Sequence, residues 1–252
     1  MNKVILITGG TGKVGSNLVA HFLKNSWTVL STTRNAENFN EVVKKHSLEA
    51  YEDNLFIVEV DFKNDNAIQD LAEYLVEQKL RPNVVVHNAR SLDYLKINER
   101  GRTEVEDLQM EFYMAVTFPY LLTNCLVDLG ELENVVFISS MYGVVAPTPK
   151  LYEDFESSSP VQYGVAKAAQ IHLVKELGVR LAKNNTRVNC VSFGGIKGRT
   201  SNEFQKRYQE LTPQGKMLEE SEVVGPVDFL VSENSENMTG QNIIVDGGWT
   251  VW

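Results

Sequence analysis

The sequence predicts an α/β fold built on a doubly wound parallel sheet of about seven strands, with helices on both faces. Short β-branched runs recur along the whole chain, and segments with helical spacing fill the gaps between them. Most of these runs are almost wholly apolar, which is typical of parallel strands that are covered on both faces. Because strand and helix alternate from end to end, we expect right-handed crossovers and a layer of helices on each side of the sheet.

The strands are predicted at residues 4–8, 28–33, 56–60, 84–87, 135–139, 187–191 and 243–245. Helices are predicted at residues 15–24, 65–78, 103–128 and 160–182, where apolar side chains repeat at helical spacing. Residues 146–160 contain three prolines and three consecutive serines, which predicts an irregular loop. This stretch is too short for a linker between domains, so we interpret residues 1–252 as one domain.

Composition and charge exclude several classes of protein. Of the 252 residues, 43% are hydrophobic and 23% are charged, which is the usual composition of a folded domain. Its net charge of -9 provides no positive field for a nucleic acid. No apolar run approaches the roughly 18 residues of a membrane span, and the N-terminal run is too short for a signal peptide. We therefore expect neither a nucleic-acid nor a membrane partner.

The cysteines and histidines predict no metal site and no disulfide framework. Cys125 and Cys190 lie in apolar runs without CxxC spacing, which fits a reducing compartment, so we expect a cytoplasmic protein. The four histidines are scattered without the spacing of metal ligands.

The first predicted strand runs into a glycine turn that opens a helix, Thr8-Gly9-Gly10-Thr11-Gly12-Lys13-Val14-Gly15. Glycines let a backbone approach a pyrophosphate, and the free N–H groups of a helix N-terminus stabilise its negative charge. The alternative is a tight strand-to-helix turn that binds nothing. The position of the turn after the first strand of an α/β pattern favours a dinucleotide site and a Rossmann-like fold.

The end of the second predicted strand indicates which dinucleotide would bind. In dinucleotide-binding folds an acidic residue there hydrogen-bonds the ribose 2′-hydroxyl of NAD. Here the strand ends Ser31-Thr32-Thr33-Arg34, which offers no carboxylate. Arg34 and Lys13 are cations that can neutralise a 2′-phosphate, so we expect NADP(H) to be preferred over NAD(H). The alternative for Arg34 is a solvated loop charge.

Further motifs follow in a fixed order, and together they resemble the short-chain dehydrogenase/reductase family in its short, single-domain branch. Ser140 lies at the end of the fifth predicted strand, and Tyr163 and Lys167 lie one turn apart on one helix. The other motifs are Asp61 after the third strand, His87-Asn88-Ala89 after the fourth, Arg187-Val188-Asn189-Cys190-Val191 in the sixth, and Thr239-Gly240-Gln241 leading to Val245-Asp246-Gly247-Gly248.

The resemblance implies that Ser140, Tyr163 and Lys167 are catalytic. It also implies that Asp61 and Asn88 lie around the adenosine and that Ile196 touches the nicotinamide amide. With the glycine turn and the two cations, the expected cofactor-binding residues are Thr8, Gly9, Gly12, Lys13, Val14, Gly15, Arg34, Asp61, Asn88, Ala89, Tyr163, Lys167 and Ile196.

The chemistry of carbonyl reduction calls for these residue types. A hydride added to a carbonyl leaves an oxyanion that needs a proton, which Tyr163 can supply while Ser140 hydrogen-bonds the same oxygen. The Lys167 ammonium favours the phenolate form of the tyrosine.

The chain departs from the family in several places, among them the spacing of the glycine turn and Phe193-Gly194 where proline-glycine is usual; three others bear on the site. The helix asparagine that joins a proton relay in the family falls near Met114 or Ala115, and neither can replace it. The third residue of the usual asparagine-alanine-glycine motif is Arg90. The stretch between Ser140 and Tyr163 is longer than in the family, and the extra length is the loop at residues 146–160. This long segment resembles oxidoreductases of bacterial surface-sugar pathways, including flagellin modification.

We therefore expect an NADP(H)-dependent oxidoreductase that acts on a carbonyl or secondary alcohol of a small molecule, such as a sugar or a nucleotide sugar. The alternative is an NADP-binding sensor or scaffold without turnover. An anionic substrate would need local basic groups, for which the candidates are Arg90, Lys96, Arg100, Arg102, Lys197 and Arg199.

Two further expectations concern assembly and the loop. The helices predicted at residues 103–128 and 160–182 carry more apolar residues than one packing stripe needs, so we expect a homodimer or a homotetramer. The loop at residues 146–160 is poor in apolar residues, so we expect it to choose the substrate rather than to build the fold. The alternative is that Tyr152 and Phe155 pack into the core or a subunit interface.

Overall fold

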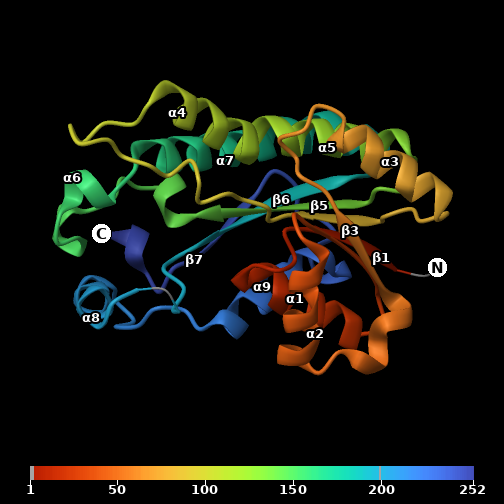
Figure 1. The fold of residues 1–252 in the computed structure, drawn as a ribbon, viewed down its shortest axis with the longest axis horizontal. Helices are drawn as coiled ribbons and strands as arrows, with labels where there is room; N and C mark the ends of the chain where they lie inside the picture. The colour runs from red at the N-terminus through yellow and green to blue at the C-terminus, as the bar shows by residue number, and fades with distance from the viewer. Residues whose placement is uncertain (1–2, 199) are drawn as a thin grey trace.

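The computed structural model describes residues 3–198 and 200–252, which form a seven-stranded parallel sheet with helices on both faces (Figure 1). The strand order is β3-β2-β1-β4-β5-β6-β7. This order reverses at β1 and β4, the arrangement of a Rossmann-like doubly wound fold, and the predicted fold class is confirmed. The strands are β1 (Val4–Thr8), β2 (Thr28–Thr33), β3 (Leu55–Glu59), β4 (Val84–His87), β5 (Asn134–Ser140), β6 (Arg187–Phe193) and β7 (Asn242–Val245).

The central strands are apolar because helices cover both of their faces. Every residue of β1, β4 and β5 is buried. In the register of the sheet, Leu6 of β1 lies beside Leu30 of β2 and Val85 of β4. All three side chains belong to the core on one face of the sheet, while Ile5 and Ile7 belong to the core on the other face. Because successive side chains of a strand point to opposite faces of the sheet, each strand contributes to both apolar layers.

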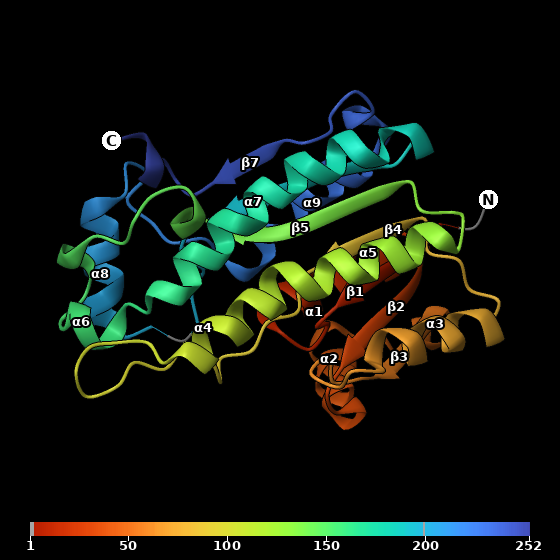
Figure 2. The same ribbon diagram turned by 90° about the horizontal axis from the view of Figure 1, so that it is seen from above.

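Two layers of helices cover the sheet (Figures 1 and 2). One layer holds α3 (Ala67–Glu77), α4 (Val105–Phe112), α5 (Phe118–Asp128) and α7 (Val161–Leu181). The other layer holds α1 (Lys13–Lys24), α2 (Phe39–His46) and α9 (Val224–Val231). The short helix α6 (Phe155–Ser158) and α8 (Asn202–Leu211) lie together near the C-terminus, beyond the carboxyl ends of the strands (Figure 2).

The segment predicted as one helix over residues 103–128 is interrupted. Between α4 and α5 the backbone forms a π-helical turn at Tyr113–Thr117, in which Met114 and Ala115 are buried. A π-turn widens the helix by one residue and shifts the side chains that follow it, and such turns are frequent at functional sites. Apolar spacing alone does not reveal it, because the buried stripe continues across the turn.

The loop at residues 146–160 is more ordered than the sequence predicts. It contains a short 3-10 turn at Pro149–Leu151 as well as α6. The Leu151 side chain is fully buried against Met141, Tyr208, Met217 and Trp249, which form a third apolar cluster. The expectation that this loop takes no part in core packing was wrong, because one leucine among polar neighbours is enough to anchor it.

Candidate active site

The predicted site residues meet at a cavity of about 740 Å³ at the carboxyl ends of the strands. This edge of the sheet is where open α/β folds bind ligands. The cavity is lined by Gly9, Gly12, Lys13, Val14, Arg34, Asp61, Asn88, Ala89, Ser140, Tyr163, Lys167 and Ile196. Thr8 and Gly15 do not line the cavity but lie behind it, where they support the glycine turn.

The glycine turn is held against the sheet by its own backbone. The Gly9 and Gly10 N–H groups both donate to the Thr32 carbonyl at 3.1 Å. Gly9 has a φ of +72°, a left-handed conformation that glycine adopts at no steric cost. A Cβ on Gly15 would come within 2.3 Å of the Gly9 carbonyl oxygen, so this close packing of turn and helix requires glycine.

The N-terminus of α1 is suited to an anion. Its N-cap is Gly12, which supplies no side-chain cap, and the first turn of the helix carries no acidic residue. A Cβ on Gly12 would meet only the Gly9 carbonyl oxygen at 3.6 Å, so the space beside this residue is open. A pyrophosphate fits such a cradle, because the unpaired N–H groups of a helix N-terminus and the helix dipole both favour negative charge.

Thr8 and Asn88 fasten the glycine turn to the segment after β4. The Thr8 hydroxyl accepts hydrogen bonds from the backbone N–H groups of Asn88 and Ala89, both at 3.0 Å. The Asn88 side-chain amide donates to the carbonyls of Thr8 and Gly9, also at 3.0 Å. These bonds fix the two walls of the cavity relative to each other.

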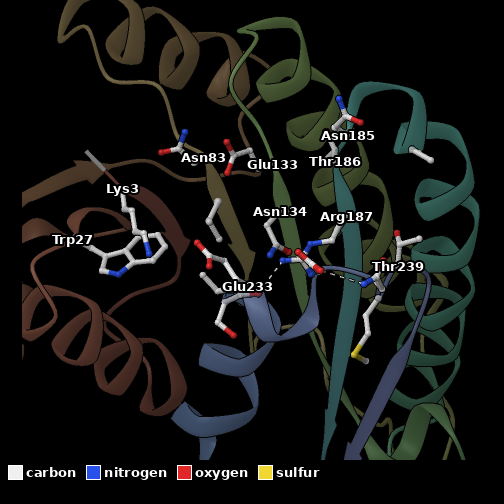
Figure 3. A pocket seen from close by; sticks show the side chains of 17 residues that line it. Lys3, Trp27, Asn83, Glu133, Asn134, Asn185, Thr186, Arg187, Glu233 and Thr239 are labelled. Atoms are coloured by element: carbon white, nitrogen blue, oxygen red, sulfur yellow. Dashed lines mark hydrogen bonds between the residues drawn. The ribbon is translucent and has the colours of Figure 1, made fainter. Parts of the chain in front are cut away.

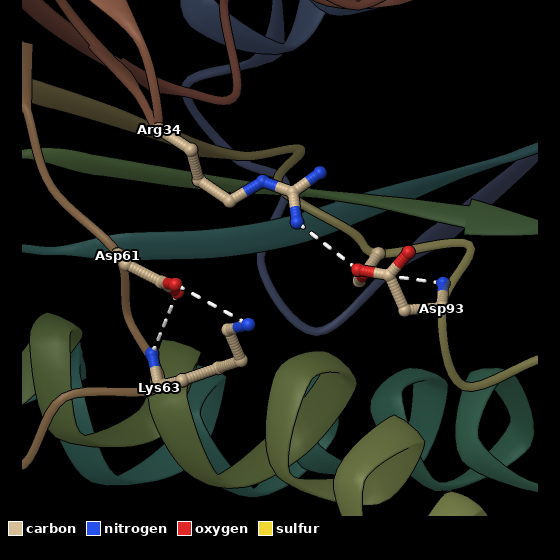
Figure 4. A network of polar contacts seen from close by, with 5 residues as sticks. Arg34, Asp61, Lys63 and Asp93 are labelled. Atoms are coloured by element: carbon tan, nitrogen blue, oxygen red, sulfur yellow. Dashed lines mark hydrogen bonds and ion pairs between the residues drawn. The ribbon is translucent and has the colours of Figure 1, made fainter.

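Charged side chains line the end of the cavity near β2 and β3, as Figure 4 shows. Arg34 forms an ion pair with Asp93 at 3.1 Å, and Lys63 forms one with Asp61 at 3.3 Å. The Ser91 hydroxyl also donates to Asp93 at 2.7 Å, and this bond, followed by that from Arg34, lowers the pKa of the Asp93 carboxyl. Arg34, one of the two cations predicted to meet a 2′-phosphate, is thus paired with the Asp93 carboxylate.

Lys13, the second predicted phosphate-binding cation, contacts the loop after β6. Its ammonium donates to the Lys197 carbonyl at 2.7 Å, which joins the turn to the loop after β6. A Cβ on Gly198 would come within 2.6 Å of the Lys13 Nζ, so the two segments are in close contact.

Ser140, Tyr163 and Lys167 come together from two elements. Ser140 ends β5, and its Oγ accepts a hydrogen bond from the Tyr142 backbone N–H at 3.2 Å, which leaves the hydroxyl proton available as a donor. Tyr163 and Lys167 lie in the first turns of α7. The Tyr163 ring is partly buried, and the Arg90 guanidinium lies 5.0 Å from its centroid, a cation–π arrangement.

Lys167 is buried beneath this group. Its ammonium donates to the Ile138 carbonyl at 2.7 Å and to the Gln170 side-chain oxygen at 3.1 Å. Burial, and after it the nearby Arg90 charge, lower the pKa of Lys167 to about 8, whereas Glu111 and then Cys190 act in the opposite direction.

Three of these residues were not identified from the sequence. They are Tyr142, whose hydroxyl is 2.8 Å from that of Tyr152, and the buried pair Glu111 and Gln170. Tyr152 comes from the loop at residues 146–160 and packs edge-on against Phe155 and Phe204. The loop therefore contributes an aromatic wall to the cavity as well as a core residue.

The basic residues considered for an anionic substrate differ in whether they line the cavity. Within the described residues, Arg90 lines it, but Lys96, Arg100, Arg102 and Lys197 do not. Lys197 forms an ion pair with Glu219. Arg199 lies outside the residues that the structure describes.

A second cavity of about 810 Å³ lies at the opposite edge of the sheet, where the strands begin (Figure 3). Several of its polar groups have partners: the Lys3 ammonium lies 5.2 Å from the Trp27 ring centroid, and Arg187 donates to the Ser232 and Ser235 carbonyls. The Asn134 side-chain oxygen is buried without a hydrogen-bond partner among the described residues. The Asn134 side-chain amide donates to the Leu230 carbonyl at 2.7 Å. None of the predicted site residues lines this cavity.

Neither a cluster of metal ligands nor a membrane-spanning helix occurs in the part of the chain that the structure describes. Over residues 3–198 and 200–252, no group of three or more His, Cys, Asp or Glu residues is arranged to hold a metal ion. In that same part of the chain, no helix is both long enough and apolar enough to cross a bilayer.

Comparisons with known proteins agree with the fold and extend over nearly the whole chain. A family model described as enoyl-(acyl carrier protein) reductase matches residues 12–250. The post-translational flagellin modification protein A of Campylobacter coli is 25% identical, and the match covers 98% of both chains.

Two solved structures are similar as well. A short chain dehydrogenase from Leptospira borgpetersenii with bound NAD+ has a TM-score of 0.86 and 30% identity, over 99% of this chain and 93% of that chain. A structure of ElxO with NADP bound has a TM-score of 0.85 and 24% identity, over 100% of each chain.

Proposed function

This chain belongs to the short-chain dehydrogenase/reductase family of oxidoreductases, and from that premise we propose that it uses NADP(H) to interconvert a carbonyl and a secondary alcohol on a sugar or nucleotide sugar. The observation that carries the proposal is the meeting of Ser140, Tyr163 and Lys167 with the glycine turn in one cavity.

The residues present fit a nicotinamide dinucleotide. Gly12 and the N-terminus of α1 would receive the pyrophosphate, with Gly9 and Val14 beside it. Asp61 would lie near the adenosine and Ile196 near the nicotinamide, and both line the cavity. When bound, NADP(H) supplies or accepts the hydride. The chain itself provides the groups that bind and protonate the substrate oxygen.

We assign the proton transfer to Tyr163. Its phenol is on the cavity wall beside Ser140, whose free hydroxyl proton can hydrogen-bond the substrate oxygen as negative charge develops there. Two cationic side chains line the same cavity: Lys167, and Arg90, whose guanidinium lies 5.0 Å from the Tyr163 ring centroid. In the oxidative direction, Tyr163 would accept the proton from the alcohol.

The preference for NADP(H) rests on the end of β2. The segment from Ser31 to Thr33 offers no carboxylate to bind a ribose 2′-hydroxyl, whereas Arg34 carries a guanidinium on the cavity wall. The Arg34 ion pair with Asp93 is exposed on both sides, so it contributes little and can be exchanged for a phosphate.

Arg34→Ala is therefore expected to weaken NADPH binding by about 10- to 100-fold, the effect of losing one hydrogen bond to a charged group. NADH binding should change little, since NADH has no 2′-phosphate. Titration of both cofactors measures the two effects. Asp93→Asn is the matched control, because it removes the ion pair but keeps the cation, and its preference for NADPH should persist. Equal affinities for NADPH and NADH in the parent would contradict the proposal.

The substrate proposal draws on the cavity wall and on one relative. Tyr142 and Tyr152 offer hydroxyl groups and aromatic faces, which suit the polar and apolar surfaces of a sugar ring, and Arg90 offers a cation for a phosphate. The similarity to a flagellin modification protein agrees with a surface-sugar pathway.

A screen tests the reaction and the substrate class together. Keto sugars, sugar phosphates and nucleotide sugars would be incubated with NADPH, and the corresponding alcohols with NADP, while absorbance at the nicotinamide band is followed. Turnover of a sugar substrate supports the proposal. Turnover of unrelated carbonyls only would overturn the sugar assignment, and tight NADPH binding without turnover of any substrate would favour the sensor or scaffold alternative.

We also propose that the chain forms a homodimer through α4, α5 and α7, which expose several large apolar side chains. They include Val105, Leu108, Phe112, Tyr120, Leu121, Val161 and Val165. Exposed apolar side chains gathered on one layer of helices are typical of a subunit interface. Light scattering at micromolar concentration should give at least twice the chain mass of 28.3 kDa. The double variant Phe112→Glu with Val165→Glu should lower that mass to the monomer value, and a monomeric parent would refute the dimer.

A further inference from the structure

Three polar side chains lie buried together between α4 and α7, beneath the cavity. Lys167 is 7% exposed, Gln170 is 2% exposed and Glu111 is 2% exposed. Burying a charged or amide group in an apolar layer is costly unless it is hydrogen-bonded.

Gln170 connects Lys167 to the turn between α4 and α5, which lies in the same helix layer as α7. Its side-chain oxygen accepts from the Lys167 ammonium at 3.1 Å, and its side-chain nitrogen donates to the Ala115 carbonyl at 2.9 Å. Ala115 lies in the π-helical turn between α4 and α5. The amide is thus held at both ends, which fixes the position of its oxygen beneath Lys167.

The contacts of Lys167 leave one direction for a ligand. An ammonium has three N–H donors. Among the described residues, the Ile138 carbonyl and the Gln170 oxygen accept two of them. Because Lys167 also lines the cavity, the third N–H is the one available to a group bound there. Without the Gln170 oxygen, the ammonium would lose both an acceptor and its orientation.

We propose that Gln170 is the positioning residue that holds the Lys167 ammonium charged and directed toward the cavity. This inference rests on the proposed oxidoreductase function, in which the Lys167 cation supports Tyr163. Gln170 suits the role because its amide oxygen favours the ammonium form without adding a charge, and its nitrogen keeps the oxygen in place through Ala115.

The surrounding charges explain why Lys167 needs this support. Burial and the Arg90 guanidinium both favour the neutral amine, whereas Glu111 on α4 and Cys190 on β6 favour the ammonium. The Glu111 carboxyl has one oxygen, Oε2, with no hydrogen-bond partner among the described residues, and burial raises its pKa. In these surroundings the loss of the Gln170 oxygen would remove one of the two acceptors that hold the ammonium.

The test follows the titration of Lys167 directly, so it does not depend on a known substrate. Lysines labelled with 13C at Cε would be titrated by NMR, with the Lys167 signal assigned by its absence in Lys167→Arg. Gln170→Leu should lower the midpoint by about one pH unit, a tenfold change in the ionisation constant, because the ammonium loses an acceptor. Gln170→Glu should raise the midpoint, because it places an anion beside the ammonium.

Gln162→Leu is the matched control. Gln162 is buried on the same helix and has hydrogen bonds of its own, to Thr103, Tyr94 and Lys96, but it does not contact Lys167. Its substitution should leave the Lys167 midpoint unchanged. A purely structural role for Gln170 would give no shift, or shifts of the same sign in the leucine and glutamate variants, and either result would overturn the proposal.

Kinetics then separate this inference from the proposed function. If the parent turns over a substrate, the pH dependence of kcat/KM should shift in the same direction as the Lys167 midpoint in each variant. If the parent turns over no substrate but the Lys167 midpoint still falls in Gln170→Leu and rises in Gln170→Glu, the positioning role is supported and the oxidoreductase function is contradicted. If Gln170→Leu does not fold, the rise in Gln170→Glu decides the question, since an unchanged midpoint there would refute the inference.

Discussion

Tyr163→Phe should lower kcat by about 10² or more on the substrate that the parent uses, the scale of removing a positioned acid or base. The substitution removes one hydroxyl from the cavity wall and keeps the ring that packs against Arg90. NADPH affinity and thermal stability should therefore stay close to those of the parent. Steady-state kinetics, a cofactor titration and a melting curve measure the three quantities.

The control for this prediction is Tyr74→Phe. Tyr74 is partly buried on α3 and does not line the cavity, so the loss of its hydroxyl should leave kcat unchanged. Parental kcat in Tyr163→Phe would show that another group transfers the proton. A loss of NADPH binding together with kcat would instead assign Tyr163 to cofactor binding.

The sheet could be predicted from the sequence because its strands are buried on both faces. A run such as Val4 to Thr8 is continuously apolar or β-branched, and the structure has a strand at those same residues. Helices that pack by a clear stripe, such as α1 and α3, were predicted to within a few residues. The order of the strands follows from the doubly wound pattern and the handedness of crossovers.

The helices α8 and α9 were missed for opposite reasons. α8 is mostly polar, and its buried side is represented by Tyr208 alone, so its stripe is weak. α9 is apolar almost throughout and contains Pro226, so it has no clear polar face and resembles a strand or a loop. In both cases the position of the helix is determined by packing against other parts of the chain.

The glycine turn, Ser140, Tyr163 and Lys167 could be predicted because their spacing is local or because they end strands at one edge of the sheet. Gln170 and Glu111 could not be paired in this way, since they lie on helices far apart in the sequence. A signal was present nonetheless. Both residues occupy positions in apolar stripes, Gln170 between Ala166 and Val174, and Glu111 one turn before Ala115. A polar residue in a buried stripe requires a partner, which the structure identifies.

The packing of the loop at residues 146–160 was predicted wrongly, because the average composition of a loop does not show that one of its residues is buried. Leu151 is fully buried, and its carbonyl accepts a hydrogen bond from the Arg207 guanidinium at 2.7 Å. These contacts join the loop to α8, which also forms part of the cavity wall through Phe204. Replacing residues 147–157 by a glycine-rich bridge is therefore expected to lower the melting temperature, in contrast to the expectation from composition.

Leu151→Ala isolates the packing part of this effect and should lower the free energy of unfolding by about 2–5 kcal/mol, the usual cost of truncating a buried leucine. The substitution would leave an empty space beside Met141, Tyr208, Met217 and Trp249. These side chains would then lose their van der Waals contacts with Leu151. Chemical denaturation measures it, with Leu92→Ala as the control, since Leu92 is 52% exposed and its truncation should change stability by less than about 0.5 kcal/mol. Tyr152→Phe keeps the ring and removes the hydroxyl that bonds Tyr142 and Ser159, so it should raise KM for the substrate without a comparable loss of stability. If Leu151→Ala were as stable as the parent, the loop would be a separable cover of the cavity after all.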